Sequence, residues 1–175
     1  MQHKCKVTVL KKMLFPELQA QYLADPASGT CPFYEEGQEF WFERYAGRDD
    51  FWTEGGGAHC AEAWDCISRY IYTALQGGAI MRGWTRDERQ MIACCNDGTR
   101  PVIFKIERVD YKALWLADDR ENPALRRALL ALEGVSGVRF CTGRGFAEVF
   151  LEQEVPDQAL LEIAAGCHAA VTRME

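Results

Sequence analysis

The sequence predicts an α+β protein of two small modules that meet near Val109, the second with a ferredoxin-like order of elements. Its 175 residues lie between the sizes of one and two compact domains of about 100 to 150 residues. Apolar residues make up 48% and charged residues 26%, which is the balance of a globular protein. After Val109 the residue pattern follows the order strand, helix, strand, strand, helix, strand. We therefore expect modules over residues 1–109 and 110–175.

The first half of the first module begins with alternating apolar and polar residues over 4–10, which predicts a half-buried strand. The residues before it, including His3, are expected to form a tail. Pro16 suits the first turn of a short helix that ends near Asp25-Pro26. A second strand is expected over 39–44, and residues 45–58 are expected to form a loop because they are rich in glycine and charge.

The second half of this module contains the longest predicted helix, over residues 59–76. Apolar side chains recur there at three- and four-residue spacing, and Gly77 can close the helix with a positive φ. Two strands, over 91–95 and 102–109, flank an Asp97-Gly98 turn signal and predict a hairpin. Successive side chains of a strand point to opposite faces, so at most one of Cys94 and Cys95 can join the core.

The second module is predicted to contain six elements with recognisable ends. In order, these are strand 111–117, helix 123–133, strand 135–141, strand 146–151, helix 156–165 and strand 168–173. Asn122 can cap the first helix with Pro123 at its first position. Gly143 and Gly145 suit the turn between the middle strands, and Gly166 is expected to end the second helix.

The charge pattern argues against two classes of partner. The net charge is -6, whereas nucleic acids and anionic membranes attract clustered Lys and Arg. The first residues lack the apolar run of a signal peptide, and no segment approaches the roughly 20 apolar residues of a membrane span. The expectation is a soluble, cytoplasmic protein that binds neither nucleic acid nor membrane, with a protein partner or a second copy of the chain as possible partners.

The eight cysteines are numerous for a protein of a reducing compartment, where disulfides are rare. They are Cys5, Cys31, Cys60, Cys66, Cys94, Cys95, Cys141 and Cys167. Three roles are open: core packing, ligation of a metal or cluster, and reactive thiol chemistry. Most are expected in the core, because free cysteine is among the most buried residue types.

The second module resembles the heavy-metal-associated domain of copper chaperones and metal-pumping ATPases over residues 114–172. The matching features are helix 124–132, Gly134-Val135 with Val138, the strand Ala147-Glu148-Val149, Val155-Pro156 and Gly166. In that family a Cys-x-x-Cys pair before the first helix binds soft metals. The corresponding positions here are Asp118 and Glu121, whose oxygen atoms do not select a soft metal. The resemblance therefore implies a module kept for docking or sensing.

The first module resembles a family of short, uncharacterised prokaryotic proteins, often from anaerobes. The matching features are Val7-Thr8-Val9-Leu10, Cys31-Pro32 with Gly37, the helix beginning Cys60-Ala61-Glu62-Ala63-Trp64, and the block from Cys94-Cys95-Asn96-Asp97-Gly98 through Thr99-Arg100-Pro101 to Val102-Ile103-Phe104-Lys105. That family brings no known reaction. The resemblance implies a domain and draws attention to its cysteines.

Two chemical roles and one structural role follow for these cysteines. Cys31, Cys60, Cys94 and Cys95 are candidate ligands for zinc or an iron–sulfur cluster, with His59 as a spare nitrogen ligand. The function predicted first is a cytosolic accessory protein that binds such a group and uses its second module for docking. The alternative is a small thiol-dependent redox or sulfur-transfer enzyme. A third possibility, a pure interaction protein, also stays open, so enzyme activity is not decided.

The alternative enzyme needs one nucleophile and one resolving thiol. Cys60 follows the glycine run 55–57 and is expected in the first turn of the long helix, where free N–H groups favour a thiolate. Cys31 or one of the hairpin cysteines would then resolve the mixed disulfide. The sequence neighbours His59 and Cys60 are not expected to form a dyad, because adjacent helical side chains point in different directions.

Overall fold

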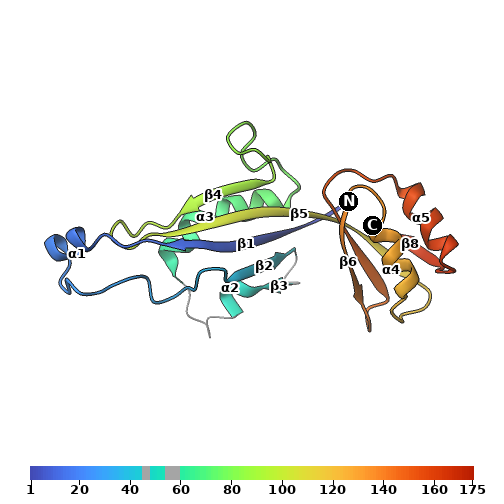
Figure 1. Ribbon diagram of the computed structural model, residues 1–175, viewed down its shortest axis with the longest axis horizontal. Coiled ribbons are helices and arrows are strands. Elements are labelled where there is room, and N and C mark those ends of the chain that lie inside the picture. The colour runs from blue at the N-terminus through green and yellow to red at the C-terminus, as the bar shows by residue number, and fades with distance from the viewer. Residues whose placement is uncertain (45–47, 54–59) are drawn as a thin grey trace. The chain divides into compact units, whose positions relative to one another are not determined.

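The computed structural model of the protein describes residues 1–44, 48–53 and 60–175 (Figure 1). It has the expected α+β class, with helices and antiparallel strands. The chain divides into two compact units, the first His3–Arg108 and the second Val109–Glu175 together with Met1–Gln2. No helix of the described residues combines the length and the apolar character needed to cross a membrane.

The first unit packs helices against a sheet in the order β3-β2-β1-β5-β4. Its strands are β1 (Gln2–Lys12), β2 (Glu39–Glu43), β3 (Arg48–Asp49), β4 (Gln90–Cys94) and the beginning of β5 (Val102–Leu116), and its helices are α1 (Pro16–Tyr22), α2 (Asp50–Thr53) and α3 (Ala61–Leu75). Ile67 and Ile71 of α3 share a core cluster with Val7 of β1 and Phe104 of β5. Burial of each of these side chains contributes about 1.5–3 kcal/mol, so the packing of α3 against the sheet contributes substantially to the stability of the unit. Cys5 is fully buried in the same core, as expected.

The second unit contains the end of β5, then α4 (Pro123–Leu130), β6 (Val135–Cys141), β7 (Phe146–Leu151), α5 (Asp157–Gly166) and β8 (Val171–Met174). Its strands lie in the order β8-β5-β7-β6, and each neighbouring pair is antiparallel. Leu125 and Leu129 of α4 and Leu160 of α5 share one core cluster with Leu114 and Val149 of the central strands. Both helices therefore cover the same face of this sheet.

Two local predictions at helix ends are confirmed. Asn122 caps α4, with its side chain accepting a hydrogen bond from the Leu125 backbone N–H at 2.9 Å, and Pro123 follows in the first turn. Gly77 has φ 76° after α3, and a Cβ atom there would lie 2.3 Å from Nε2 of His3. His3 therefore lies in β1 against this turn, and its assignment to a tail is wrong. The tight contact requires glycine at position 77 for space as well as for backbone conformation.

The boundaries of several elements differ from the predictions. Residues 102–116 form one strand, β5, where two strands separated near Val109 were expected. Residues 107–111 contain no glycine or proline, so nothing in the backbone interrupts the strand. The expected loop over 45–58 contains β3 and α2 in its described part. These short elements lack the periodicity by which longer strands and helices are recognised.

The end of α5 uses an unusual residue. Gly166 is the last helical residue, as expected, but the left-handed conformation falls on His168, with φ 55°. The N–H groups of His168 and Ala169 donate to the carbonyls of Ala165 and Ala164, which completes a Schellman-type end. A side chain with a Cβ atom is strained in this conformation.

We expect His168→Gly to stabilise the second unit by about 0.5–1 kcal/mol, because glycine adopts positive φ without strain. His168→Ala removes the same imidazole but keeps the Cβ atom, so it should give no such gain. Thermal unfolding of both variants checks this. Equal stabilities of the glycine and alanine variants would show that the backbone at position 168 is not strained.

Candidate functional site

The candidate site of the first unit is centred on Tyr34, a residue that sequence reasoning did not select. Its side chain is 6% exposed, and its ring meets Phe40 and Phe104 edge to face and stacks on Phe51. These aromatic contacts fix the ring, so the hydroxyl has one direction in which to point. The only sequence signal was its position three residues after Cys31, which is too weak to distinguish it from a core aromatic residue.

Three cysteines lie near enough to Tyr34 to influence its ionisation. Burial raises the pKa of Tyr34 strongly, and negative charge on Cys60, Cys31 and Cys95 raises it further. A side-chain hydrogen bond between Tyr34 and Cys60 acts in the same direction, because the hydroxyl keeps its proton to donate to the sulfur. We call Tyr34, Cys31, Cys60 and Cys95 the Tyr34 thiol cluster. It brings together three of the four cysteines proposed as ligands.

Cys60 owes its position to the start of α3. It is the N-cap residue, with φ -85° and ψ 110°, and its carbonyl accepts the first helical hydrogen bond, from Trp64, at 3.0 Å. It therefore lies one residue before the helical turn in which it was expected. Its thiol makes no capping hydrogen bond and is partly exposed. The thiol therefore lies beside both the positive end of the helix and the Tyr34 side chain.

Cys95 is held by the loop that joins β4 to β5. Its backbone N–H donates to the Val102 carbonyl at 3.0 Å, and the Val102 N–H donates to its Sγ at 3.2 Å. Asp97 closes the loop by accepting hydrogen bonds from the N–H groups of Thr99 at 2.8 Å and Arg100 at 3.1 Å, and from Nε of Arg100 at 3.0 Å. Hydrogen bonds within residues 97–100 thus stabilise the loop that contains Cys95.

Cys31 lies in the loop between α1 and β2 and is 9% exposed. The loop just before it is fixed by Gln19, a fully buried residue of α1. The Gln19 Nε2 donates to the Gly29 carbonyl at 2.9 Å, and the Gly29 N–H donates to Oε1 of Gln19 at 3.1 Å. A glutamine is exposed far more often than buried, so nothing in the sequence indicates this role for Gln19.

Cys94 and Cys66 lie beside the cluster with different properties. Cys94 is exposed, whereas Cys95 packs against the core, so the prediction that only one of the pair joins the core is confirmed. Burial and the charge of Cys95 raise the pKa of the Cys94 thiol. Burial, followed by the charges of Cys95 and Cys94, raises the pKa of Cys66 to about 12, and its thiol donates to the Ala63 carbonyl at 3.1 Å. Cys66 is therefore a neutral thiol at physiological pH.

The four proposed metal ligands do not form one donor set. Cys31, Cys60 and Cys95 face Tyr34, while Cys94 is exposed to solvent. Over residues 1–44, 48–53 and 60–175, no group of three or more His, Cys, Asp or Glu side chains has an arrangement that could hold a metal ion. His59 and the glycine run 55–57 lie outside the described residues.

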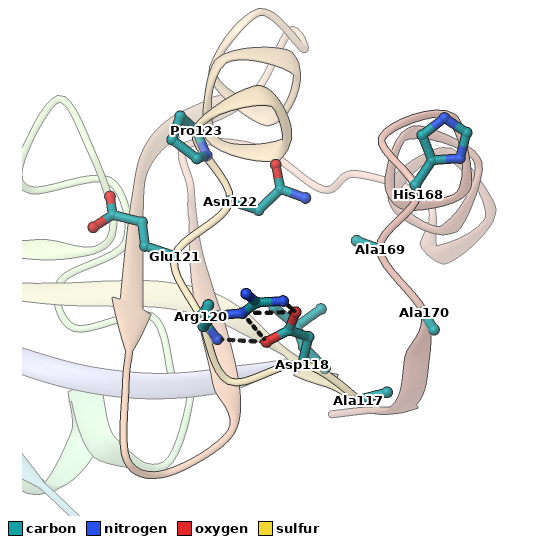
Figure 2. A pocket seen from close by; sticks show the side chains of 10 residues that line it. Ala117, Asp118, Arg120, Glu121, Asn122, Pro123, His168, Ala169 and Ala170 are labelled. Atoms are coloured by element: carbon teal, nitrogen blue, oxygen red, sulfur yellow. Dashed lines mark hydrogen bonds and ion pairs between the residues drawn. The ribbon is translucent and has the colours of Figure 1, made fainter.

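The second unit has a cavity of about 350 Å³ at the loop before α4, which contains Asp118 and Glu121 (Figure 2). It is lined by Leu116, Ala117, Asp118, Arg120, Glu121, Asn122, Pro123, His168, Ala169 and Ala170. The Arg120 guanidinium holds the pKa of the exposed Asp118 at about 2 by hydrogen bonding, and Arg126 pairs with Glu121. Both carboxylates are thus occupied by arginines, and the imidazole of His168 points away from them in Figure 2.

Comparison with known proteins adds no relative to this picture. The chain matches no protein-family model, no curated protein and no solved structure. The site must be interpreted from its own geometry.

Proposed function

We propose that the chain is a thiol-dependent redox protein in which Cys60 is the nucleophile and Cys31 or Cys95 is the resolving thiol. One observation carries this proposal: Tyr34 is buried beside Cys60, Cys31 and Cys95, and its pKa is raised first by burial and then further by interaction with these three thiols, including hydrogen bonding to Cys60. Partial exposure allows Cys60 to reach a substrate, and its sulfur lies at the N-terminus of α3 beside the tyrosine hydroxyl.

The reaction that suits this arrangement is reduction of a disulfide in a partner molecule. The Cys60 thiolate attacks one sulfur of the partner disulfide, whose S–S bond breaks, and a mixed disulfide forms while the released thiolate takes up a proton. The thiol of Cys31 or Cys95 then loses its proton and attacks the Cys60 sulfur, which releases the second partner sulfur as a thiolate that also takes up a proton. The partner gains two electrons from the two protein thiols and two protons, one from the resolving thiol and one from solvent, and the protein is left with an internal disulfide.

For the second unit we propose a ferredoxin-like module that docks a partner protein. The order β5-α4-β6-β7-α5-β8 and the strand order β8-β5-β7-β6 support this assignment, as does the placement of both helices over one core. The resemblance to heavy-metal-associated domains fits the same element order. The carboxylates Asp118 and Glu121 at the positions of the thiol ligands make docking the better proposal than soft-metal transfer.

The test of the redox proposal is alkylation of anaerobically purified protein at neutral pH, with the modified cysteine identified by mass spectrometry. We expect one fast thiol, Cys60, which Cys60→Ser removes. Cys94→Ser is the matched control: Cys94 is more exposed, but burial raises its pKa, so its loss should leave the fast phase unchanged. Mild oxidation should link Cys60 to Cys31 or Cys95. A fast phase that follows Cys94 would contradict the proposal.

The same preparation should be analysed for zinc, iron and acid-labile sulfide, because a metal- or cluster-binding accessory protein is the competing proposal. Its support is that three cysteines each influence the ionisation of Tyr34. Stoichiometric metal bound through Cys31, Cys60 and Cys95 would replace the redox proposal.

Tyr34→Phe provides a second, quantitative test. Hydrogen bonds to a charged group are worth about 1.5–3 kcal/mol, so loss of the hydroxyl should slow alkylation of Cys60 about tenfold or more. Tyr72→Phe removes a hydroxyl from a side chain that is 61% exposed and should have no effect. Alkylation rates at neutral pH, with circular dichroism as a check on folding, distinguish the two variants. An unchanged rate in Tyr34→Phe would show that the hydroxyl does not assist Cys60.

A further inference from the structure

The sheet of the second unit has a face that its helices do not cover. On the helix side lie Leu114 of β5 and Val149 of β7, which belong to the core cluster with α4 and α5. Because side chains alternate along a strand, the opposite face of these two central strands carries four aromatic residues. They are Tyr111 and Trp115 of β5 and Phe146 and Phe150 of β7.

The four rings form two cross-strand pairs. Trp115 lies directly opposite Phe146 in the strand register, with ring centroids 4.9 Å apart. Tyr111 lies opposite Phe150, with centroids 6.2 Å apart. Tyr111, Trp115 and Phe150 are partly exposed, while Phe146 is buried. The two pairs form an aromatic platform of tilted rings along the middle of the sheet, with the opposed residues Ala113 and Glu148 between the pairs.

Three exposed arginines lie over these rings. The guanidinium carbons of Arg144, Arg173 and Arg139 are 5.0, 5.4 and 5.9 Å from the ring centroids of Phe146, Trp115 and Phe150, respectively. Arg139 pairs with Glu148, and Arg173 pairs with Glu175. For Arg144, no ion pair is found within the part of the chain that the structure describes. We call the four rings with these three arginines the aromatic face.

We propose that the aromatic face binds single-stranded RNA. Unstacked bases stack on aromatic rings and on guanidinium planes, and arginines also pair with phosphates, so this combination suits a nucleic-acid strand. An acidic peptide would use the arginines but would leave the ring platform without a partner. Arg144-Gly145-Phe146-Ala147 at the start of a central strand follows the order basic, glycine, aromatic, small that occurs in RNA-binding sheets.

The local charge of the face differs from that of the chain. Its three arginines are opposed by Glu148 and Glu175, whereas the net charge of -6 is summed over all 175 residues. With three phosphate contacts at most, the logarithm of the association constant should fall with the logarithm of salt concentration with a slope of about -2. Such weak electrostatics predict dissociation constants in the micromolar range at low salt, with much of the affinity supplied by stacking.

The proposal does not depend on the thiol cluster, because the seven side chains all belong to the second unit. Cys60→Ser should therefore bind RNA as the unmodified chain does. Failure of the redox proposal would leave this one standing, and the reverse also holds.

The test is fluorescence anisotropy of labelled oligouridine with the full chain under reducing conditions. We expect quenching of tryptophan fluorescence on binding, and roughly tenfold weaker binding by Trp115→Leu, which keeps an apolar residue in the strand. Arg144→Glu should also weaken binding several-fold. Arg127→Glu makes the same charge change on α4, where the side chain is exposed, and should have no effect.

Four outcomes would overturn the proposal. These are no binding to oligouridine, binding to single-stranded DNA alone, equal weakening by Arg144→Glu and Arg127→Glu, and binding of polyglutamate as tight as that of RNA. The last result would show an electrostatic surface without stacking. Binding to both RNA and DNA with loss in Trp115→Leu supports the proposal, because every base presents a ring to stack.

Discussion

Replacing Leu129 with lysine is expected to unfold the second unit. Leu129 is fully buried between α4 and the sheet, in the same cluster as Leu125 and Leu160. The change removes a buried apolar side chain and places an unpaired ammonium group in the core, at a cost of about 3–5 kcal/mol or more. Small domains are stable by only about 5–15 kcal/mol, so a unit of this size should not retain its structure.

Leu130→Lys is the matched control, since it makes the same substitution one residue later at a position that is 45% exposed. Circular dichroism and amide dispersion in NMR spectra of the two full-length variants measure the difference. The Leu129 variant should lose the signals of the second unit, whereas the Leu130 variant should keep them. Similar spectra for the two variants would contradict the placement of Leu129 in the core.

The same measurement applied to residues 109–175 alone examines whether the second unit is an independent module. Its core cluster, formed by Leu114, Leu125, Leu129, Leu160 and neighbouring residues, lies entirely within this segment. We therefore expect the segment to fold. An unfolded segment would favour one continuous domain, in which β5 needs its N-terminal part to remain a strand.

How far the sequence could predict the fold depends on the range of the interactions involved. The cap at Asn122, the β6–β7 turn at Gly143 and Gly145, and the apolar stripe of α3 are local features, and all were predicted. The continuity of β5 was not, because its outer residues are ordered by different neighbours: β4 pairs with its first part, and β7 with its last. Such long-range pairing cannot be recognised from a short segment of sequence.

The candidate site shows the same limit. The cysteine pattern selects Cys31, Cys60, Cys94 and Cys95 together as candidate site residues. Alternation along a strand predicts that only one of Cys94 and Cys95 faces the core, but the sequence does not show which one, and the structure places Cys95 near Tyr34 and exposes Cys94. Tyr34 and Gln19 gain their roles from burial and from partners such as Cys60 and Gly29, which are ten or more residues away. A buried polar residue and an exposed one are identical in the sequence, so only the fold distinguishes them.

Net charge is a coarse measure for assessing partners, because it does not describe how charges are distributed over the surface. A value of -6 makes polyanion binding unattractive for the chain as a whole, and this was the basis of the expectation that it does not bind nucleic acid. Arg173 is far from Arg139 and Arg144 in sequence, yet β6, the β6–β7 turn and β8 place each of the three over a ring. Clustering of this kind depends on strand order, which a summed charge does not contain.

Alkaline pH is expected to destabilise the first unit, because three of its buried or partly buried groups ionise more readily in the unfolded chain than in the folded one. Burial raises the pKa of Cys5 strongly above its usual value of 9.0, that of Cys66 to about 12, and that of Tyr34 well above 10.0. In the unfolded chain these groups lose their protons near pH 9 to 10, whereas in the folded chain they keep them. The folded state therefore binds more protons at high pH, and stability falls as pH rises.

The size of this effect can be bounded for one group. A group that stays protonated in the folded state but ionises on unfolding contributes a loss of about 1.4 kcal/mol per pH unit above its unfolded pKa. For Cys5, which is fully buried, this amounts to about 2–3 kcal/mol between pH 9 and 11. Cys66 is only partly buried, so solvent screening makes its contribution smaller.

Denaturant unfolding under anaerobic, reducing conditions at pH 7, 9, 10 and 11 measures this loss. Cys5→Ala should be less stable than the unmodified chain at pH 7 because of the cavity, but its stability should decline less steeply above pH 9, since one titrating group is gone. Between pH 6 and 8 both states hold the proton, so the two proteins should show parallel pH dependence there, which serves as an internal control. Parallel curves above pH 9 as well would mean that Cys5 ionises in the folded protein, and its thiol would then have to be accessible to water and to alkylating reagents.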